Sequence, residues 1–426
     1  MDNIRRINCA LLIGLVTTVG LIPAAAGQWP QWRGPDGAGV SDATGLATRW
    51  DATTNVRWRL ALPGPGPSTP VVWGDRIFLT AAAGDDLVLM AISTAGKEIW
   101  RRRLADGNKV IRSGESNMAA PSPVTDGEHV WVLLGTGYLA SFDFAGDEVW
   151  QFNLQERYEP FSMYHGYSSS PLLYGGRIYI QALHGNQQLV AALDGGTGAE
   201  LWKHIRATDA RDECLHSYAS PTIYRDGGTE LLLIQGADYL TAHRPADGKE
   251  VWRVGGLQDE KGYNPMFRLV ATPVSAAGLV VVPSAKNGPV LGIDPSGATG
   301  DITAAGKHLA WRLDRGTPDV PSPLIHDGLV YLSRENGAVI CLDAKTGELL
   351  YEERPSRERH RGSPLLADGK LYLMGMDGTV TVLRAGRRYE LLAQNTIDEQ
   401  IAASPAVAGN TLYLRTYEAL YAIRGN

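Results

Sequence analysis

One phrase returns eight times along the 426-residue chain, and this repetition restricts the fold more than any other feature. Its clearest copy runs from Val320 to Tyr351 and contains a Ser-Pro pair, three turn sequences and an aromatic residue near its end. The turns at Asp327-Gly328, Asn336-Gly337 and Thr346-Gly347 supply the positive φ that tight hairpins require. Each copy therefore predicts four short strands, and such a unit repeated along a chain is typical of a propeller or a solenoid.

Two positions align the copies. The Ser/Thr-Pro pair that opens each copy begins at Thr69, Ser122, Ser170, Ser220, Thr272, Ser322, Ser363 and Ser404. The aromatic residue that closes a copy is Trp100, Trp150, Trp202, Trp252, Trp311 or Tyr351, and the seventh copy ends in Leu391-Leu392 instead. A tryptophan at the start of each outer strand is expected to wedge between blades and cover the glycine turn of the neighbouring blade.

The eighth copy supplies three strands, ending with the run from Ala419 to Ile423. A matching outer strand stands near the other end of the chain, where Val56 to Leu62 carries Trp58 and has no opening phrase of its own. Pairing the two segments closes a ring and removes two unpaired edges, whereas a solenoid would have atypical repeats at both ends. The sequence therefore predicts an all-β fold, an eight-bladed β-propeller over residues 56–426.

The first 26 residues have the pattern of a cleaved signal peptide. Arg5 and Arg6 precede an apolar run from Ile7 to Ile22, and Ala24 to Ala26 offer a small-residue cleavage site. The alternative is a retained membrane anchor, although the run is short of the roughly 20 residues that a span needs. We therefore expect a periplasmic or secreted protein.

Composition limits the possible partners. The net charge of −6 argues against nucleic acid, because binding phosphates requires a basic face. After removal of the signal peptide no apolar run is long enough to span a membrane, and we expect a monomer. Cys214 and Cys341 lie in different repeats at different points of the phrase, so they are expected to be unpaired.

The segment from Ala192 to Trp202 resembles the Ala-x-Asp-x-x-Thr-Gly-x-x-x-Trp docking motif of quinoprotein-type propellers, the repeats first seen in pyrroloquinoline-quinone (PQQ) dehydrogenases. The run from Cys341 to Glu348 echoes it. The leader from Trp29 to Pro35 also resembles the segment that precedes the first blade in many exported members. We expect residues 27–55 to form an N-terminal strap on the outside of the ring.

The sequence lacks features that the resemblance to PQQ dehydrogenases would require. It contains neither a vicinal cysteine pair nor a Cys-x-x-Cys-His haem attachment. It is more similar to the propeller lipoprotein of the outer-membrane β-barrel assembly machinery, although it lacks a lipobox. This resemblance implies a non-catalytic scaffold of the cell envelope with no cofactor, which binds a protein, peptide or glycan. The alternative is a PQQ-dependent dehydrogenase-like enzyme with the quinone and Ca²⁺ at the funnel.

Any binding site is expected on the funnel rim. In a propeller, the connections into each innermost strand and the turns between second and third strands open on one face, and these are the least uniform parts of this chain. The candidate ligand-binding residues are Glu115, Asn117, His165, Tyr167, His216, Tyr218, Asn264, Arg268, Asn287, Arg334, His360, Arg361, Glu399 and Gln400. We predict no catalytic residue and no metal ligand among them.

Other interpretations of these residues remain open. His165, His216 and His360 are possible metal ligands, but their wide spacing favours hydrogen-bonded loop histidines. Glu115, Asn117, Asp212, Asn287 and Glu399 offer oxygen ligands for Ca²⁺ beneath a quinone. The cluster Arg357, Arg359 and Arg361, opposite Glu115 and Glu399, suits an acidic ligand or a peptide terminus.

Overall fold

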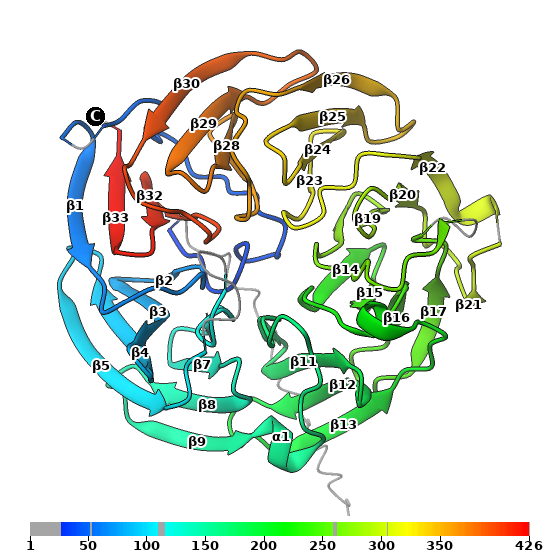
Figure 1. Ribbon diagram of the computed structural model, residues 1–426, viewed down its shortest axis with the longest axis horizontal. Coiled ribbons are helices and arrows are strands. Elements are labelled where there is room, and N and C mark those ends of the chain that lie inside the picture. Colours follow the sequence, from blue (N-terminus) through cyan, green and yellow to red (C-terminus); the bar gives the residue numbers. More distant parts are fainter. Residues whose placement is uncertain (1–26, 52, 110–115, 259–261, 305, 426) are drawn as a thin grey trace, which may run out of the picture.

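The chain forms a ring of eight blades around a central channel, as the computed structural model shows (Figure 1). The structure describes residues 27–51, 53–109, 116–258, 262–304 and 306–425. The proposed signal peptide, residues 1–26, lies outside them. The prediction of an all-β, eight-bladed propeller is therefore confirmed for the described part of the chain.

Each blade is an antiparallel sheet in which consecutive strands are neighbours. The first four blades are formed by β2 Val71–Trp73, β3 Arg76–Ala83, β4 Asp86–Ser93 and β5 Glu98–Ala105; β6 Val124–Thr125, β7 His129–Leu133, β8 Tyr138–Asp143 and β9 Glu148–Asn153; β10 Leu172–Tyr174, β11 Arg177–His184, β12 Gln187–Asp194 and β13 Glu200–Ile205; and β14 Thr222–Asp226, β15 Thr229–Gly236, β16 Tyr239–His243 and β17 Glu250–Val254.

The remaining blades repeat this order. They are formed by β18 Val274–Ala276, β19 Leu279–Pro283, β20 Val290–Ile293 and β22 Leu309–Leu313; β23 Leu324–His326, β24 Leu329–Ser333, β25 Val339–Asp343 and β26 Leu349–Glu353; β27 Leu365–Ala367, β28 Lys370–Met374, β29 Thr379–Arg384 and β30 Leu391–Thr396; and β31 Ala406–Ala408, β32 Thr411–Arg415, β33 Ala419–Arg424 and β1 Val56–Ala61. Short helical turns (α1 Leu154–Arg157, η1 Asp212–Leu215 and η3 Gly306–His308) lie outside the blades, and β21 Gly300–Asp301 pairs in parallel with β17.

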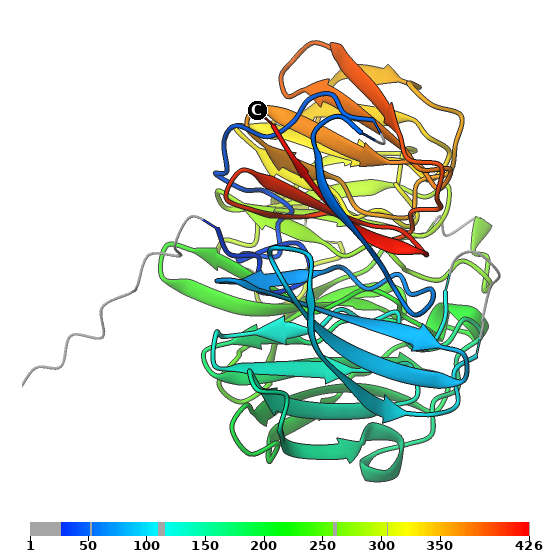
Figure 2. The same cartoon turned by 90° about the vertical axis from the view of Figure 1, so that its left-hand side faces the viewer.

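The ring closes as predicted, by pairing of the two distant segments. β1 lies antiparallel to β33, with Trp58 opposite Ala422 and Leu60 opposite Leu420 (Figure 2). The N-terminal strand thus supplies the outer strand of the last blade. This pairing covers the β33 edge that would otherwise be open.

The closing tryptophans lock each blade to the next, as expected. A Cβ added at Gly248 would lie 2.4 Å from the ring of Trp202, so the ring lies directly against the turn of the following blade. The indole N–H groups of Trp58, Trp100, Trp150, Trp202 and Trp311 each donate to a carbonyl oxygen of the adjacent blade's turn, at 2.8–3.0 Å. Trp252 differs because β21 pairs beside it, and its N–H has no hydrogen-bond partner within the described residues.

The core lies between the blades, because the central strands are buried on both faces. Six consecutive residues of β3 are buried, and the same is true of β4. Inter-blade clusters result, such as the one that packs Ile180 of β11 against Trp131 of β7. Cys214 and Cys341 are buried and unpaired, in agreement with the prediction. No helix among the described residues is long and apolar enough to cross a membrane.

The prediction that the strap packs on the outside of the ring is wrong. Residues 29–40 instead lie across the centre of the ring, where Figure 1 shows them in dark blue, and the chain then runs outward, with Trp50 stacked on Tyr372 of β28. Trp29 pairs with Val72 of β2, and Arg33 donates from its guanidinium to the carbonyl oxygen of Pro323. Both side chains are buried. The innermost strands present unpaired edges to the channel, and the strap supplies partners for them.

Candidate functional site

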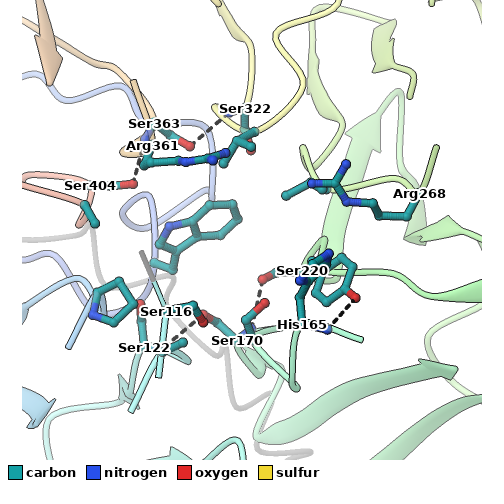
Figure 3. A pocket seen from close by; sticks show the side chains of 18 residues that line it. Ser116, Ser122, His165, Ser170, Ser220, Arg268, Ser322, Arg361, Ser363 and Ser404 are labelled. Atoms are coloured by element: carbon teal, nitrogen blue, oxygen red, sulfur yellow. Dashed lines mark hydrogen bonds between the residues drawn. The ribbon is translucent and has the colours of Figure 1, made fainter. Parts of the chain in front are cut away.

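A cavity of about 200 Å³ occupies the central channel on the face where the blades are connected (Figure 3). The strap forms its floor through Trp32, and the walls come from the ends of the connections that lead into the innermost strands. Its lining residues are Trp32, Pro67, Ser116, Ala120, Ser122, His165, Ser168, Ser170, Tyr218, Ser220, Arg268, Val270, Val320, Ser322, Arg361, Ser363, Ala402 and Ser404.

The Ser/Thr-Pro pairs form a hydrogen-bonded circle around this cavity, which we call the hydroxyl ring. The backbone N–H of each Ser or Thr donates to the hydroxyl of its counterpart in the next blade, from Thr69 round to Ser404, at 2.9–3.0 Å. The proline that follows has no N–H, so it leaves no donor to satisfy in the channel wall. The pair therefore joins each blade to the next along the channel wall, from the first blade to the last.

One wall of the cavity is built around a buried glutamate. Glu213 lies on η1, and its Oε1 is 3.2 Å from Nε2 of His165 and 3.3 Å from Nε of Arg268. The hydroxyl of Tyr218 accepts a 3.2 Å hydrogen bond from the backbone N–H of His165. Burial raises the pKa of Tyr218, which therefore stays protonated. Three successive connections are joined at this point, and they bring His165, Tyr218 and Arg268 to the cavity together.

A second glutamate holds the opposite wall. Oε1 of Glu335 is 3.2 Å from Nη2 of Arg361 and 2.7 Å from Nη2 of Arg359. Asp319 is buried beside this group, and burial together with the neighbouring Glu335 raises its pKa, although Arg268 acts in the opposite direction. The basic cluster predicted from the sequence is thus partly neutralised. Arg357 is exposed and does not line the cavity.

Four of the predicted site residues line the cavity, namely His165, Tyr218, Arg268 and Arg361. Three others lie near it within the connections. Tyr167 is buried and donates to the carbonyl oxygen of Gln181 at 2.8 Å. His216 is buried, which lowers its pKa, and its ring meets that of Tyr164 edge-on at 4.8 Å between centroids. Asn117 donates to the carbonyl oxygen of Pro65 at 3.0 Å.

The structure places other predicted residues away from the cavity. Nδ1 of His360 is 2.8 Å from the hydroxyl of Ser333, and burial lowers the pKa of His360 to about 4. Arg334 pairs with Glu352 at 3.2 Å on the blade exterior. Asn287 is exposed in a turn with positive φ, and Asn264 accepts from the backbone N–H of Met266.

Glu399 belongs to the seam of the last blade, where β1 pairs with β33. Its Oε1 is 2.8 Å from Nη2 of Arg59 on β1 and accepts from the hydroxyl of Tyr421 at 2.5 Å. Burial favours the protonated acid, but the hydrogen bonds from Thr416, Tyr421 and Arg59 outweigh it and lower the pKa of Glu399. The suggestion that Glu399 acts with the arginine cluster is therefore wrong. Gln400 is exposed beside it, and Glu115 lies outside the described residues.

The cavity is a poor match for Ca²⁺. Within the described residues, its walls carry hydroxyl, guanidinium, imidazole and phenol groups and no carboxylate. Calcium takes its ligands mainly from carboxylate and carbonyl oxygens. The oxygen ligands suggested by the sequence are dispersed, with Asp212 and Asn287 exposed on separate loops and Glu399 at the seam. A quinone held over Ca²⁺ is therefore not supported by these side chains.

One group among the described residues has metal-ligand spacing, and it lies elsewhere. His204, His243 and Glu250 bring their ligand atoms within 4.8 Å of one another between β13 and the following blade. Glu250 is held by both Nε and Nη2 of Arg253 at 2.5 and 2.8 Å. Both ring nitrogens of His243 are occupied, by the hydroxyl of Thr241 and the carbonyl oxygen of Gly248. The group is satisfied by the protein itself.

Sequence reasoning missed the floor and the anchors of the cavity. Trp32 belongs to the leader, which was assigned to the outside of the ring. Glu213 and Glu335 lie close to predicted site residues in the sequence. Each is recognised as part of the site only through its ion pair with an arginine on another connection, Arg268 or Arg361. The irregularity of the connections indicated the region in which the cavity lies, but it carried no information on which side chains turn inward.

The chain matches the model of one protein family and resembles proteins of known structure. A family model described as outer membrane protein assembly factor BamB matches residues 38–159, 86–299 and 294–425. The crystal structure of BamB from Moraxella catarrhalis is similar, with 16% identity, a TM-score of 0.65 and coverage of 86% of this chain and 99% of that one. Comparison with curated proteins gave no match.

Enzymes of known structure share the same fold. Quinohemoprotein alcohol dehydrogenase from Comamonas testosteroni is 15% identical with a TM-score of 0.65, over 93% of this chain and 80% of that one. A europium-containing methanol dehydrogenase is 12% identical with a TM-score of 0.63, over 92% and 90% of the two chains. At these identities the similarity concerns the fold alone.

Proposed function

The chain belongs to the family of the outer membrane protein assembly factor BamB, and we therefore propose that it is a non-catalytic scaffold that binds a partner protein in the cell envelope. The proposal includes export through cleavage of residues 1–26. Fractionation of the native host with an antibody against the propeller tests that step, and recovery of the mature chain in the cytoplasm would contradict it.

The observation that carries the proposal is a pair of exposed apolar side chains on two connections that also supply cavity-lining residues, and we call this pair the rim patch. It consists of Tyr164, whose exposed fraction is 60%, and Met266, whose exposed fraction is 48%. Apart from these two, the large hydrophobic side chains exposed in the described part of the chain are on outer strands, at most two in any blade. Aromatic residues and methionine are enriched in protein interfaces.

The rim patch is held in place by the connections beneath it. The Tyr164 ring rests on His216, and the backbone N–H of Cys214 donates to the carbonyl oxygen of Pro265, next to Met266, at 3.0 Å. The thiol of Cys214 also lies 3.3 Å from the carbonyl oxygen of Asn264. Both apolar side chains are therefore presented by loops anchored to the same turn, η1. Such pre-organisation lowers the entropy cost of binding a partner.

Site-specific crosslinking in the native host tests the proposal. A photo-crosslinking amino acid at position 164 should trap one envelope protein, and the same group at Arg244, exposed in the turn before β17, should not. The purified partner should then bind the parent chain at least tenfold more tightly than a Tyr164→Ala, Met266→Ala double variant. Equal crosslinking from both positions, or equal affinity for both chains, would remove the basis of the proposal.

The alternative function is a PQQ-linked dehydrogenase, and an activity measurement separates the two. As a scaffold, the purified chain should show no dye-linked dehydrogenase activity with added PQQ and Ca²⁺. Alcohol oxidation that requires both PQQ and Ca²⁺ would favour the enzyme instead.

A further inference from the structure

The central cavity contains more hydrogen-bond donors than the protein uses. Six serines of the hydroxyl ring line it: Ser122, Ser170, Ser220, Ser322, Ser363 and Ser404. Each hydroxyl oxygen accepts an N–H from the preceding blade, and within the described residues no acceptor is in place for its own proton. A hydroxyl has one proton to donate, so the wall offers a circle of O–H donors to whatever occupies the cavity.

Two cationic side chains extend over this circle. The guanidinium groups of Arg268 and Arg361 point toward one another from opposite walls (Figure 3). Their side chains are only 14% and 9% exposed. Oε1 of Glu213 lies 3.3 Å from Nε of Arg268, and Nε has no hydrogen-bond partner within the described chain. A guanidinium carries five N–H donors, so Arg268 has donors beyond the one that faces Glu213.

We propose that this cavity binds a small oxyanion, a carboxylate or phosphate group, between Arg268 and Arg361 above Trp32. Guanidinium and hydroxyl groups are the donors that recognise such acceptor-only ligands, and charge-assisted hydrogen bonds are the strong ones. The two glutamates that pair with these arginines are not among the lining residues. The volume of about 200 Å³ is many times the ~15 Å³ that one water requires. The site therefore accommodates a metabolite-sized anion.

This proposal goes beyond the scaffold function, because the cavity is separate from the rim patch. None of the cavity-lining residues belongs to the patch, although His165 directly follows Tyr164 in the chain. A bound anion would hold the two arginine-bearing connections across the channel. The site thus provides a place where a small molecule acts on the surface that faces a partner.

Calorimetry at low ionic strength, on the purified chain in anion-free buffer, tests the site. Phosphate and succinate distinguish the two oxyanion sources, and neutral succinamide controls for charge. We expect saturable binding of one or both anions, with affinity at least tenfold lower in Arg268→Gln and in Arg361→Gln. The matched control is Arg103→Gln, on an exposed side chain of β5, which should bind as the parent does.

A second measurement guards against variants that lose their fold. Tryptophan emission should change on anion binding in the parent, and most of that change should disappear in Trp32→Phe, which keeps an aromatic floor. Circular dichroism establishes that each variant is folded. The proposal is overturned if neither anion binds at millimolar concentration, if succinamide binds as well as succinate, or if folded Arg268→Gln keeps the parent affinity.

Discussion

Nη1 of Arg415, at the end of β32, donates a 2.9 Å hydrogen bond to the carbonyl oxygen of Ser68, which precedes the first blade. It also donates to the hydroxyl of Ser68. Arg415 is 1% exposed, and burial lowers its pKa to about 9. The bonds cross the seam of the ring, where the hydroxyl of Thr69 has no partner within the described residues. Arg415 therefore joins the last blade to the first beside a gap in the hydroxyl ring.

Replacing Arg415 should weaken ring closure. Arg415→Ala removes both seam bonds and leaves a cavity, so we expect a loss of roughly 2–4 kcal/mol of unfolding free energy. Urea denaturation followed by circular dichroism measures it. Arg103→Ala, at a side chain 56% exposed, is the control and should change stability by less than about 0.5 kcal/mol. Similar losses of unfolding free energy in the two variants would mean that the hydrogen bonds of Arg415 do not stabilise ring closure.

Because tryptophan rings pack directly on glycine turns, replacing glycine by alanine should destabilise the protein by different amounts at two positions. Gly248 and Gly74 both have positive φ, at +73° and +59°, but an added Cβ at Gly248 meets Trp202 whereas at Gly74 it meets nothing within 4 Å. Gly74→Ala should cost roughly 1–2 kcal/mol for backbone conformation alone. Gly248→Ala should cost a further ~1–3 kcal/mol through overpacking. Equal decreases in Tm for the two variants would show that the Trp202 side chain moves aside without a loss of stability.

The fold was predictable because its determinants are local and repeated. Turn sequences such as Asn336-Gly337 define strand ends without knowledge of distant contacts, and Trp58 identifies the strand that completes the last blade. The strap was misplaced for the opposite reason. Arg33 carries a charge, yet it is buried with its guanidinium on backbone carbonyl oxygens. That environment exists only once the blades are assembled.

The site was predictable in region and not in detail. Tyr218 and Arg268 come from irregular connections, which marked them as candidates, and both line the cavity. His360 comes from an equally irregular connection but turns toward Ser333 at the end of β24. The direction of a loop side chain depends on partners from other connections, which one sequence does not reveal. The serines of the hydroxyl ring serve in the sequence only to align the copies, yet they also form the cavity wall.

Burial of His360 should make stability depend on pH. Its pKa is lowered to about 4, below the usual 6.5, so between these values the folded state binds fewer protons than the unfolded state. Stability therefore rises with pH across this window and is lost on acidification, by up to roughly 3 kcal/mol from this residue. His360→Gln can still bond to Ser333 but cannot titrate. Its free energy of unfolding should fall less between pH 7 and pH 4.5 than that of the parent.

The stability of the His360→Gln variant should still depend partly on pH, because of two other buried histidines. Burial also lowers the pKa values of His184 and His243 to about 4, so these side chains act in the same direction. The variant should thus reduce the acid sensitivity without abolishing it. An unchanged difference between pH 7 and pH 4.5 would mean that His360 does not limit acid stability.

Ring closure through β1 leads to the strongest expected effect on solubility. Replacing Val56–Ala61 with a Gly/Ser segment of equal length keeps the strap attached but removes the strand that pairs with β33. The exposed β33 edge should then recruit other chains, because unpaired strand edges are templates for association. Light scattering and size-exclusion chromatography should show aggregates, while Arg57→Ser, at an exposed position of β1, should stay monomeric. A soluble, monomeric replacement variant with the parent Tm would contradict closure by this strand. Adding a peptide that spans 56–61 should suppress aggregation if edge exposure is the cause.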